Sequence, residues 1–109
     1  MLSANEYQKR AMRTLNPELS KFEGMLIDGA LGLAGEAGEV VDLIKKWYAQ
    51  GHDLKRDLIL EELGDVCWAV AEVAMALDID FEEIMQANLK KIEKRYPDGF
   101  EVERSIERG

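Results

Sequence analysis

The sequence contains little that would suit a secreted or membrane-inserted protein. Its single cysteine, Cys67, has no partner for a disulfide within the chain. No apolar run approaches the roughly 18 residues that a membrane-spanning helix needs, and the first residues lack the basic stretch and apolar core of a signal peptide. We therefore expect a cytoplasmic protein that does not enter a membrane.

Basic residues are also scarce. The 109 residues include 22 acidic and 14 basic side chains, which gives a formal net charge of −8. Such a field repels polyanions, so neither nucleic acid nor anionic lipid is expected as a partner. A small phosphorylated ligand is compatible with this charge, because a bound divalent ion can reverse the local sign of an acidic pocket. The acidity is thus a reason to look for a cation site.

Strand signals are nearly absent, and both prolines fall at the ends of segments with helical periodicity. Capping signals and periodicity predict four helices, over about residues 3–15, 22–49, from Asp53 or Asp57 to Asp78, and 80–96. The expected fold is all-α, a bundle-like single domain over 1–109 with its core at about 22–97. The polar tail, 98–109, is expected to fray unless it docks on another subunit.

Apolar residues recur at helical intervals along the third predicted helix. The stripe expected to be buried consists of Ile59, Leu63, Val66, Val70, Val73 and Leu77. Cys67 and Trp68 lie among these residues, so we expect both in the core. Because a domain this small can need a partner chain to complete its core, oligomerisation is also expected.

Glycine recurs at every third position in the middle of the second predicted helix, at Gly29, Gly32, Gly35 and Gly38. Each costs about 1 kcal/mol relative to alanine in an exposed helix interior, so something must offset that cost. Close packing against a neighbouring helix is one explanation, and room for a ligand beside the helix is the other. Both can hold for Gly35 and Gly38, which flank Glu36.

Acidic residues form two pairs with the same spacing. Glu36 and Glu39 lie three residues apart on the second predicted helix, and Glu62 and Asp65 lie three apart on the third. Each pair projects from one helix face, so antiparallel packing of the helices can bring four carboxylates together. Clustered carboxylates repel one another, and the cost grows as they are desolvated. A hard divalent cation such as Mg²⁺, which prefers oxygen ligands, resolves this conflict.

The alternative is that these side chains are ordinary solvated charges on helix faces. Their neighbours argue against it, since small or strongly apolar residues surround both pairs and place them near the boundary of the core. Glu61 adjoins Glu62 but points about 100° away around the helix. We expect it to accept a proton from water or to orient another group rather than to bind a metal.

Four segments together carry a family resemblance. They are Gly32-Leu33-Ala34-Gly35-Glu36-Ala37-Gly38-Glu39-Val40, Glu61-Glu62-Leu63-Gly64-Asp65-Val66, Asn88-Leu89-Lys90-Lys91 and Lys94-Arg95-Tyr96-Pro97. In this order they resemble the MazG-like nucleoside triphosphate pyrophosphohydrolases of the all-α NTP pyrophosphatase superfamily, over about residues 24–100. The resemblance implies hydrolysis between the α- and β-phosphates of a nucleotide, which releases a monophosphate and pyrophosphate. It also implies a homodimer or homotetramer.

Position by position, the resemblance makes the paired acids the ligands of Mg²⁺, for which Mn²⁺ can substitute. These ligands are Glu36, Glu39, Glu62 and Asp65. Family members often carry another acid near the first pair, where this sequence has Gly35, so the number of metal ions stays open. Asn88 and Lys91 match the family's phosphate contacts, and Arg95 lies one turn further along; the alternative for Lys91 and Arg95 is a plain exposed charge.

The remaining roles are hypotheses. Glu39 and Glu61 are the candidates for the catalytic carboxylate that accepts a proton from the attacking water. Trp47, with Lys46 beside it, is the candidate for contact with the base, whereas His52 is expected to be a turn residue. A non-catalytic helical module that binds a nucleotide or a protein remains the alternative to an enzyme, and a narrower substrate of the same superfamily is a third possibility.

Overall fold

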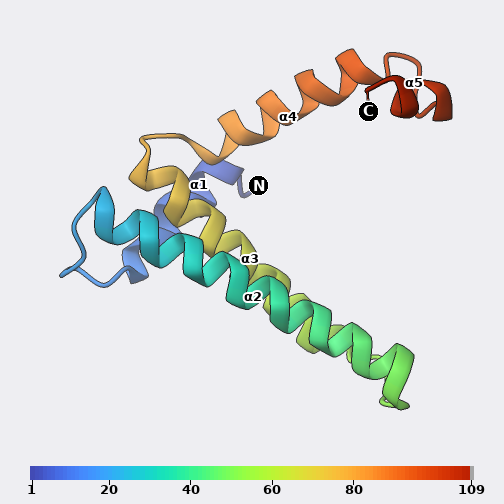
Figure 1. The fold of residues 1–109 in the computed structure, drawn as a ribbon. Helices are drawn as coiled ribbons and strands as arrows, with labels where there is room; N and C mark the ends of the chain where they lie inside the picture. The colour runs from blue at the N-terminus through green and yellow to red at the C-terminus, as the bar shows by residue number, and fades with distance from the viewer. Residues whose placement is uncertain (109) are drawn as a thin grey trace.

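The computed structural model describes residues 1–108, and helices make up most of this range (Figure 1). In chain order they are α1 (Ala4–Ala11), the 3-10 turn η1 (Met12–Thr14), α2 (Glu23–Gln50), α3 (Arg56–Ala76), α4 (Phe81–Arg95) and α5 (Val102–Arg108). The predicted all-α class is confirmed. Within 1–108, no helix has the length and apolar character that a bilayer crossing demands.

Helices α2 and α3 form a long antiparallel hairpin, which makes up most of the tertiary packing (Figure 1). Helix α2 continues without interruption to Gly51, whose φ of 74° is the left-handed conformation that favours glycine. The expectation that Asp53 or Asp57 caps α3 is wrong. Lys55 occupies the cap position and makes no side-chain bond there, while Asp57 lies in the first turn, where a carboxylate still favours the helix dipole.

The four glycines from Gly29 to Gly38 on α2 differ in how closely α3 approaches them. A Cβ added to Gly29 would lie 2.8 Å from Val73 Cγ2 and 3.1 Å from the Val73 backbone nitrogen. Close helix packing therefore explains Gly29. A Cβ on Gly32 would meet only Ala69 Cβ, at 3.8 Å, and Cβ atoms on Gly35 and Gly38 would meet nothing within 4 Å. Packing within this chain does not account for the last two, which lie beside the acidic residues.

This difference predicts opposite effects of alanine at two neighbouring glycines. Gly29→Ala is expected to lower the free energy of unfolding by about 1–3 kcal/mol, because backbone atoms that cannot move aside block the added methyl. Gly32→Ala is the matched control and should raise it by about 0.5–1 kcal/mol through helix propensity. Chemical denaturation followed by circular dichroism measures both, and equal changes in the two variants would contradict the packing explanation.

Helix α1 packs across the end of the hairpin through the side chain of Gln8. The Gln8 amide nitrogen donates to the carbonyl oxygens of Ala71, at 3.2 Å, and Ile79, at 3.1 Å, while its side-chain oxygen accepts from the backbone nitrogen of Phe81 at 2.9 Å. One buried amide thereby joins α1, the end of α3 and the start of α4. Two of these bonds satisfy the Ile79 carbonyl in the α3–α4 turn and the free backbone nitrogen of Phe81 at the start of α4.

Two predicted helix starts are correct. Ser3 caps α1 by accepting from the backbone nitrogen of Glu6 at 3.1 Å. Asp80 and Glu83 form the predicted capping box at the start of α4, with Asp80 nitrogen 2.8 Å from Glu83 Oε2. Capping signals are local in the chain, so they can be identified without knowledge of the tertiary structure.

The buried core of this single chain is small and lacks large aliphatic side chains. Its apolar members are two methionines and four alanines: Met12, Met25, Ala69, Ala71, Ala74 and Ala76. The predicted apolar stripe of α3 is only partly correct, because Leu63 is 48% exposed and Leu77 is 45% exposed. Cys67, which we expected to be buried, is exposed. The radius of gyration is 17.0 Å, well above the about 13 Å typical of a compact domain of this size.

Helix α4 leaves the hairpin as an extended arm (Figure 1). All residues from Met85 to Lys94 are exposed, and none of the α4 side chains is buried. After the arm, the segment that we expected to fray instead forms the short helix α5. Gly109, the last residue of the predicted tail, lies outside the described residues.

Candidate metal centre

Three of the four predicted ligands converge between α2 and α3. Carboxylate oxygens of Glu36, Glu62 and Asp65 lie within 4.8 Å of one another, and Glu36 and Glu62 are half-buried. The antiparallel register of α2 and α3 explains the convergence. Gly32 on α2 faces Ala69 on α3. From these two residues toward the loop that joins the helices, the following turns of α2 and α3 carry the three acids. The prediction that paired carboxylates meet across the two helices is correct for these three residues.

Glu39, the fourth predicted ligand, adjoins the cluster through Glu62. A hydrogen bond shared with Glu39 is the main cause that raises the pKa of the Glu62 carboxyl to about 7, and Glu36 adds to it. Negative charges this close repel one another, so Glu62 keeps its proton to a higher pH than an isolated carboxyl does. Glu39 itself is exposed and belongs to the solvent edge of the site.

The cluster also contains carboxylate oxygens without a partner. Oε2 of Glu36 and Oε2 of Glu62 are both buried, and neither has a hydrogen-bond partner. A buried acceptor in this state is expensive unless a donor or a cation satisfies it. Oxygen donors of this number and charge fit Mg²⁺ or Mn²⁺, which keep several waters and leave positions for phosphate oxygens.

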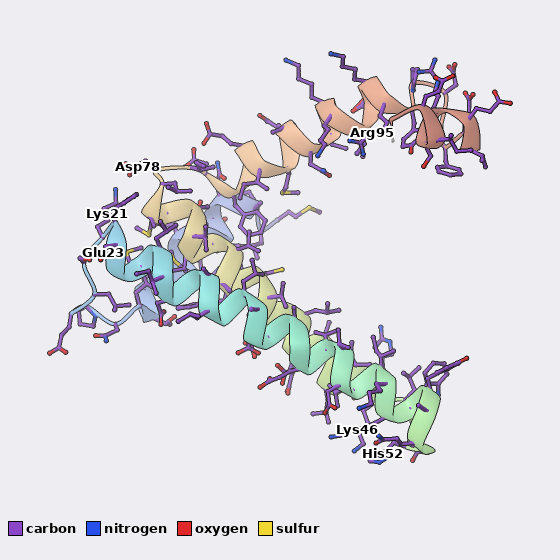
Figure 2. The ribbon with its side chains drawn as sticks, in the orientation of Figure 1. Lys21, Glu23, Lys46, His52, Asp78 and Arg95 are labelled. Carbon is purple, nitrogen blue, oxygen red and sulfur yellow. The ribbon has the colours of Figure 1, made fainter. Side chains whose placement is uncertain are left out.

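The other predicted site residues lie away from this cluster. Glu61 is exposed and is not among the converging acids. Lys46 lies near the closed end of the hairpin, where its amino group pairs with Asp42 at 2.7 Å and lowers the pKa of that carboxyl. The next residue, Trp47, is 45% exposed, and its ring is tilted against that of Tyr48. Figure 2 shows Lys46 and Arg95 at opposite ends of the molecule.

The predicted phosphate contacts lie on α4. Asn88 and Lys91 are exposed, and Arg95 is half-buried near the end of the arm. Their spacing of three and four residues places them on one face of the helix. The structure of a single chain therefore presents these side chains together but does not bring them to the carboxylates.

A cavity of about 440 Å³ opens directly beside the cluster, and sequence reasoning did not identify it. Its lining includes Glu36 and Asp65 from the cluster, and further residues from the same two helices: Asp28, Leu31, Gly32, Trp68 and Ala69. Trp68, which we expected in the core, is half-buried here. Its indole nitrogen donates to the Ala11 carbonyl at 3.1 Å and to Thr14 Oγ1 at 2.8 Å, which fixes the ring.

Behind this cavity lies an acidic residue that the sequence analysis also missed. Glu72 is completely buried, and when it is ionised neither of its carboxylate oxygens has a hydrogen-bond partner. Burial is the main cause that raises its pKa to about 7, and a hydrogen bond with Asp28 adds to the shift. The sequence signal was an acid inside the apolar run Ala71-Glu72-Val73, seven residues after Asp65.

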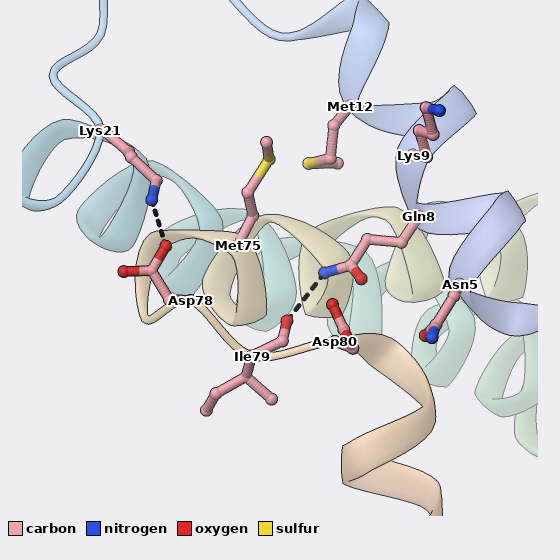
Figure 3. Close-up of a pocket in the computed structure, with 9 residues that line it drawn as sticks. All are labelled: Asn5, Gln8, Lys9, Met12, Lys21, Met75, Asp78, Ile79 and Asp80. Atoms are coloured by element: carbon pink, nitrogen blue, oxygen red, sulfur yellow. Dashed lines mark hydrogen bonds and ion pairs between the residues drawn. The ribbon is translucent and has the colours of Figure 1, made fainter.

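A second cavity, of about 450 Å³, lies between α1 and the α3–α4 turn (Figure 3). It is lined mainly by residues of α1 and the turn, where Lys21 pairs with Asp78 and Gln8 bonds to the Ile79 carbonyl. None of the predicted site residues borders it. The chemistry therefore has to be sought at the carboxylate cluster rather than here.

Comparison with known proteins identifies the family of this arrangement. Residues 29–100 match the model of the MazG nucleotide pyrophosphohydrolase domain, a range that contains all the converging acids and α4. The chain belongs to the MazG nucleotide pyrophosphohydrolase family. The resemblance inferred from the four motif segments is thereby confirmed.

A curated relative of this MazG family member comes from a bacteriophage. The chain is 39% identical over 69 residues to the Gene 37 protein of Mycobacterium phage L5, and the match covers 60% of each protein. No solved structure matches the chain. The family assignment therefore rests on the domain model and on the site geometry.

Proposed function

We propose that this chain is a Mg²⁺-dependent nucleotide pyrophosphohydrolase that cleaves the α–β phosphate bond of nucleoside triphosphates. The observation that carries the proposal is the convergence of Glu36, Glu62 and Asp65, with two buried oxygens that only a cation or a donor can satisfy. Mg²⁺ held there, with Mn²⁺ as a substitute, supplies charge neutralisation for the triphosphate and lowers the pKa of water. A nucleotide-binding module would not need carboxylates this crowded.

The test is a product assay. Purified protein is incubated with a panel of canonical ribo- and deoxyribonucleoside triphosphates and Mg²⁺, and the products are separated by chromatography. The proposal expects a monophosphate and pyrophosphate as the first products. Orthophosphate and a diphosphate as first products would contradict the bond specificity, and the absence of turnover with binding retained would favour a non-catalytic module.

Glu39 is the better of the two candidates for the group that accepts the proton from the attacking water. Glu39 adjoins Glu62 at the solvent edge of the cluster and is the main cause of that residue's raised pKa, whereas Glu61 is exposed outside the cluster. Glu39→Gln is therefore expected to lower kcat about a hundredfold or more, and Glu61→Gln less than tenfold. Steady-state kinetics of the two variants measures this difference; a larger loss in Glu61→Gln would reverse the assignment.

Metal affinity should depend on pH near neutrality. The pKa of Glu62 is raised to about 7 in the metal-free protein, so Glu62 is protonated below that value and ionised above it. Since Mg²⁺ must displace this proton, its affinity should fall as pH decreases through 7. Titration of Mg²⁺ at pH 6, 7 and 8, followed by isothermal calorimetry, checks the trend. Glu62→Gln should weaken binding and remove most of the pH dependence.

Assembly from two or more copies is part of the proposal. The α4 arm exposes an apolar stripe of Met85, Leu89 and Ile92, and the hairpin exposes its own apolar residues, among them Leu31, Leu58, Leu60 and Leu63. Exposed apolar area of this extent favours association. The C-terminal half of the arm is also basic, with Lys90, Lys91, Lys94 and Arg95 against the single acid Glu93, and so complements the acidic hairpin. A homodimer or homotetramer in which α4 covers another copy's hairpin would bring Asn88, Lys91 and Arg95 toward the carboxylates.

A further inference from the structure

The cavity beside the carboxylate cluster has carboxylates toward both of its ends and small or apolar residues between them. Glu36 and Asp65 lie at one end, and Asp28 lies eight residues earlier on α2, about 12 Å along the helix axis. Leu31, Gly32 and Ala69 contribute small or apolar surface along the walls. The volume of about 440 Å³ falls within the roughly 300–1,000 Å³ of small-molecule sites. If phosphates lie at the cluster, as proposed above, the nucleoside extends toward Asp28.

The ring of Trp68 offers a nucleobase only its face. The indole N–H, its one donor, is already used in the bonds to Ala11 and Thr14. A fixed aromatic face stacks on any base and so cannot select among them. The polar side chains that line the cavity are Asp28, Glu36 and Asp65, all of them carboxylates. Any selection by hydrogen bonds must therefore come from donors on the ligand.

Glu72 is a buried neighbour of Asp28 and positions its carboxylate. Gly29 allows α2 to approach α3 closely at this level, where an added Cβ would be 3.3 Å from Glu72 Cβ. Glu72 is completely buried, and its carboxyl lies close enough to that of Asp28 to form a hydrogen bond when Glu72 is protonated. Burial, together with the neighbouring Asp28 carboxyl, raises the pKa of Glu72 to about 7, and the protonated form of Glu72 can donate to Asp28. The exposed carboxylate oxygen of Asp28 then remains an acceptor for the cavity.

We propose that Asp28, positioned by Glu72, recognises the amino group of a nucleobase, so that this site prefers nucleotides with an amino-bearing edge over their keto counterparts. Cytosine N4 and adenine N6 are donors that a carboxylate accepts. Uracil and hypoxanthine have carbonyl oxygens at the same positions. Each of these oxygens would face the Asp28 carboxylate, and because both groups are acceptors no hydrogen bond can form between them. This inference rests on the proposed function for the placement of the phosphates.

Two pairs of substrates isolate this contact. CTP differs from UTP, and ATP from ITP, by an amino group in place of a carbonyl at the recognised position and by the absence of the hydrogen on the adjacent ring nitrogen. The wild-type protein is expected to show a kcat/KM for CTP about tenfold above that for UTP, with the same direction for ATP over ITP. In Asp28→Asn, whose amide can donate to a carbonyl, the preference should vanish or invert. Asp57→Asn, which removes one exposed charge at the start of α3, should leave the ratio unchanged.

Glu72 is tested as a positioning residue by two substitutions. Glu72→Gln keeps a donor toward Asp28 and should retain the CTP/UTP ratio, whereas Glu72→Leu should reduce it severalfold while activity with UTP persists. If Glu72→Leu fails to fold, the Asp28→Asn ratios still decide the proposal. A change in the ratio of ribo- to deoxyribonucleotides in Asp28→Asn, with the base ratio unchanged, would mean that Asp28 faces the sugar and would overturn the proposal.

Binding without turnover separates this inference from the proposed activity. CMP and UMP are titrated onto the full chain by calorimetry. Tighter binding of CMP than UMP, lost in Asp28→Asn, supports base recognition even if no triphosphate is hydrolysed. Hydrolysis of CTP and UTP with equal kcat/KM in the wild-type protein, unchanged in Asp28→Asn, would overturn the base recognition and leave the pyrophosphohydrolase proposal standing. Absence of both turnover and a CMP preference would overturn both.

Discussion

Asp65→Asn is expected to reduce the release of pyrophosphate on the order of a hundredfold to a thousandfold, the loss typical of removing a preorganised charge-stabilising group. Asp65 is one of the three acids whose oxygens lie within 4.8 Å of one another. The same substitution removes a like charge from a crowded site, so the metal-free protein should become slightly more stable. Lower activity together with a higher melting temperature in EDTA is a signature that a simple folding defect cannot produce.

Added metal provides the second half of this test. Mg²⁺ binds the folded state and should raise the melting temperature of the wild-type protein as its concentration increases. That increase should be largely lost in Asp65→Asn. Asp57→Asn is the control on the same helix, since it also removes one carboxylate and its side chain is 97% exposed. Thermal unfolding with and without Mg²⁺ measures both; an unchanged response to Mg²⁺ in Asp65→Asn would rule out Asp65 as a ligand.

The order and type of the helices could be predicted because the signals lie close together in the chain. Ser3 caps α1, and Asp80 and Glu83 cap α4, as their spacing indicates. The start of α3 could not be predicted in the same way. Two aspartates compete there on sequence grounds, and neither side chain makes the capping bond because the turn after Gly51 places Lys55 at the cap. Capping depends on the path of the loop as well as on residue type.

The carboxylate cluster was predictable because two properties of the sequence agree. The spacing of three residues fixes the face of each pair, and two long helices joined by a short loop must run antiparallel. The depth of burial was not predictable. Periodicity identifies the apolar face of α3 but not which part of it the chain itself covers, so Leu63 proved exposed and Glu72 buried. The direction of α4 depends on the turn after Ala76, for which the helical periodicity contains no information.

The exposed stripe of α4 leads to the second large expected effect. Leu89→Asp combined with Ile92→Asp should convert the proposed oligomer to a monomer and reduce activity on the order of a hundredfold or more. Leu89 is 53% and Ile92 is 39% exposed in the single chain, so neither contributes to a core that the chain completes alone. A charge in an apolar contact between copies must be desolvated without a partner, which is strongly unfavourable. Analytical ultracentrifugation and the pyrophosphate assay measure the two effects.

The control for this pair is Ala87→Asp, which places a carboxylate on the side of α4 opposite Leu89. It carries a similar penalty in helix propensity, so it separates a weakened helix from a lost contact. We expect Ala87→Asp to remain assembled. Because residue 87 lies one helical turn from Lys91, a proposed phosphate contact, only the assembly of this control is compared with that of the double variant. If the double variant is monomeric but fully active, Asn88, Lys91 and Arg95 do not act on another copy's carboxylates. In that case α4 of the same chain would have to fold back over the hairpin during the reaction.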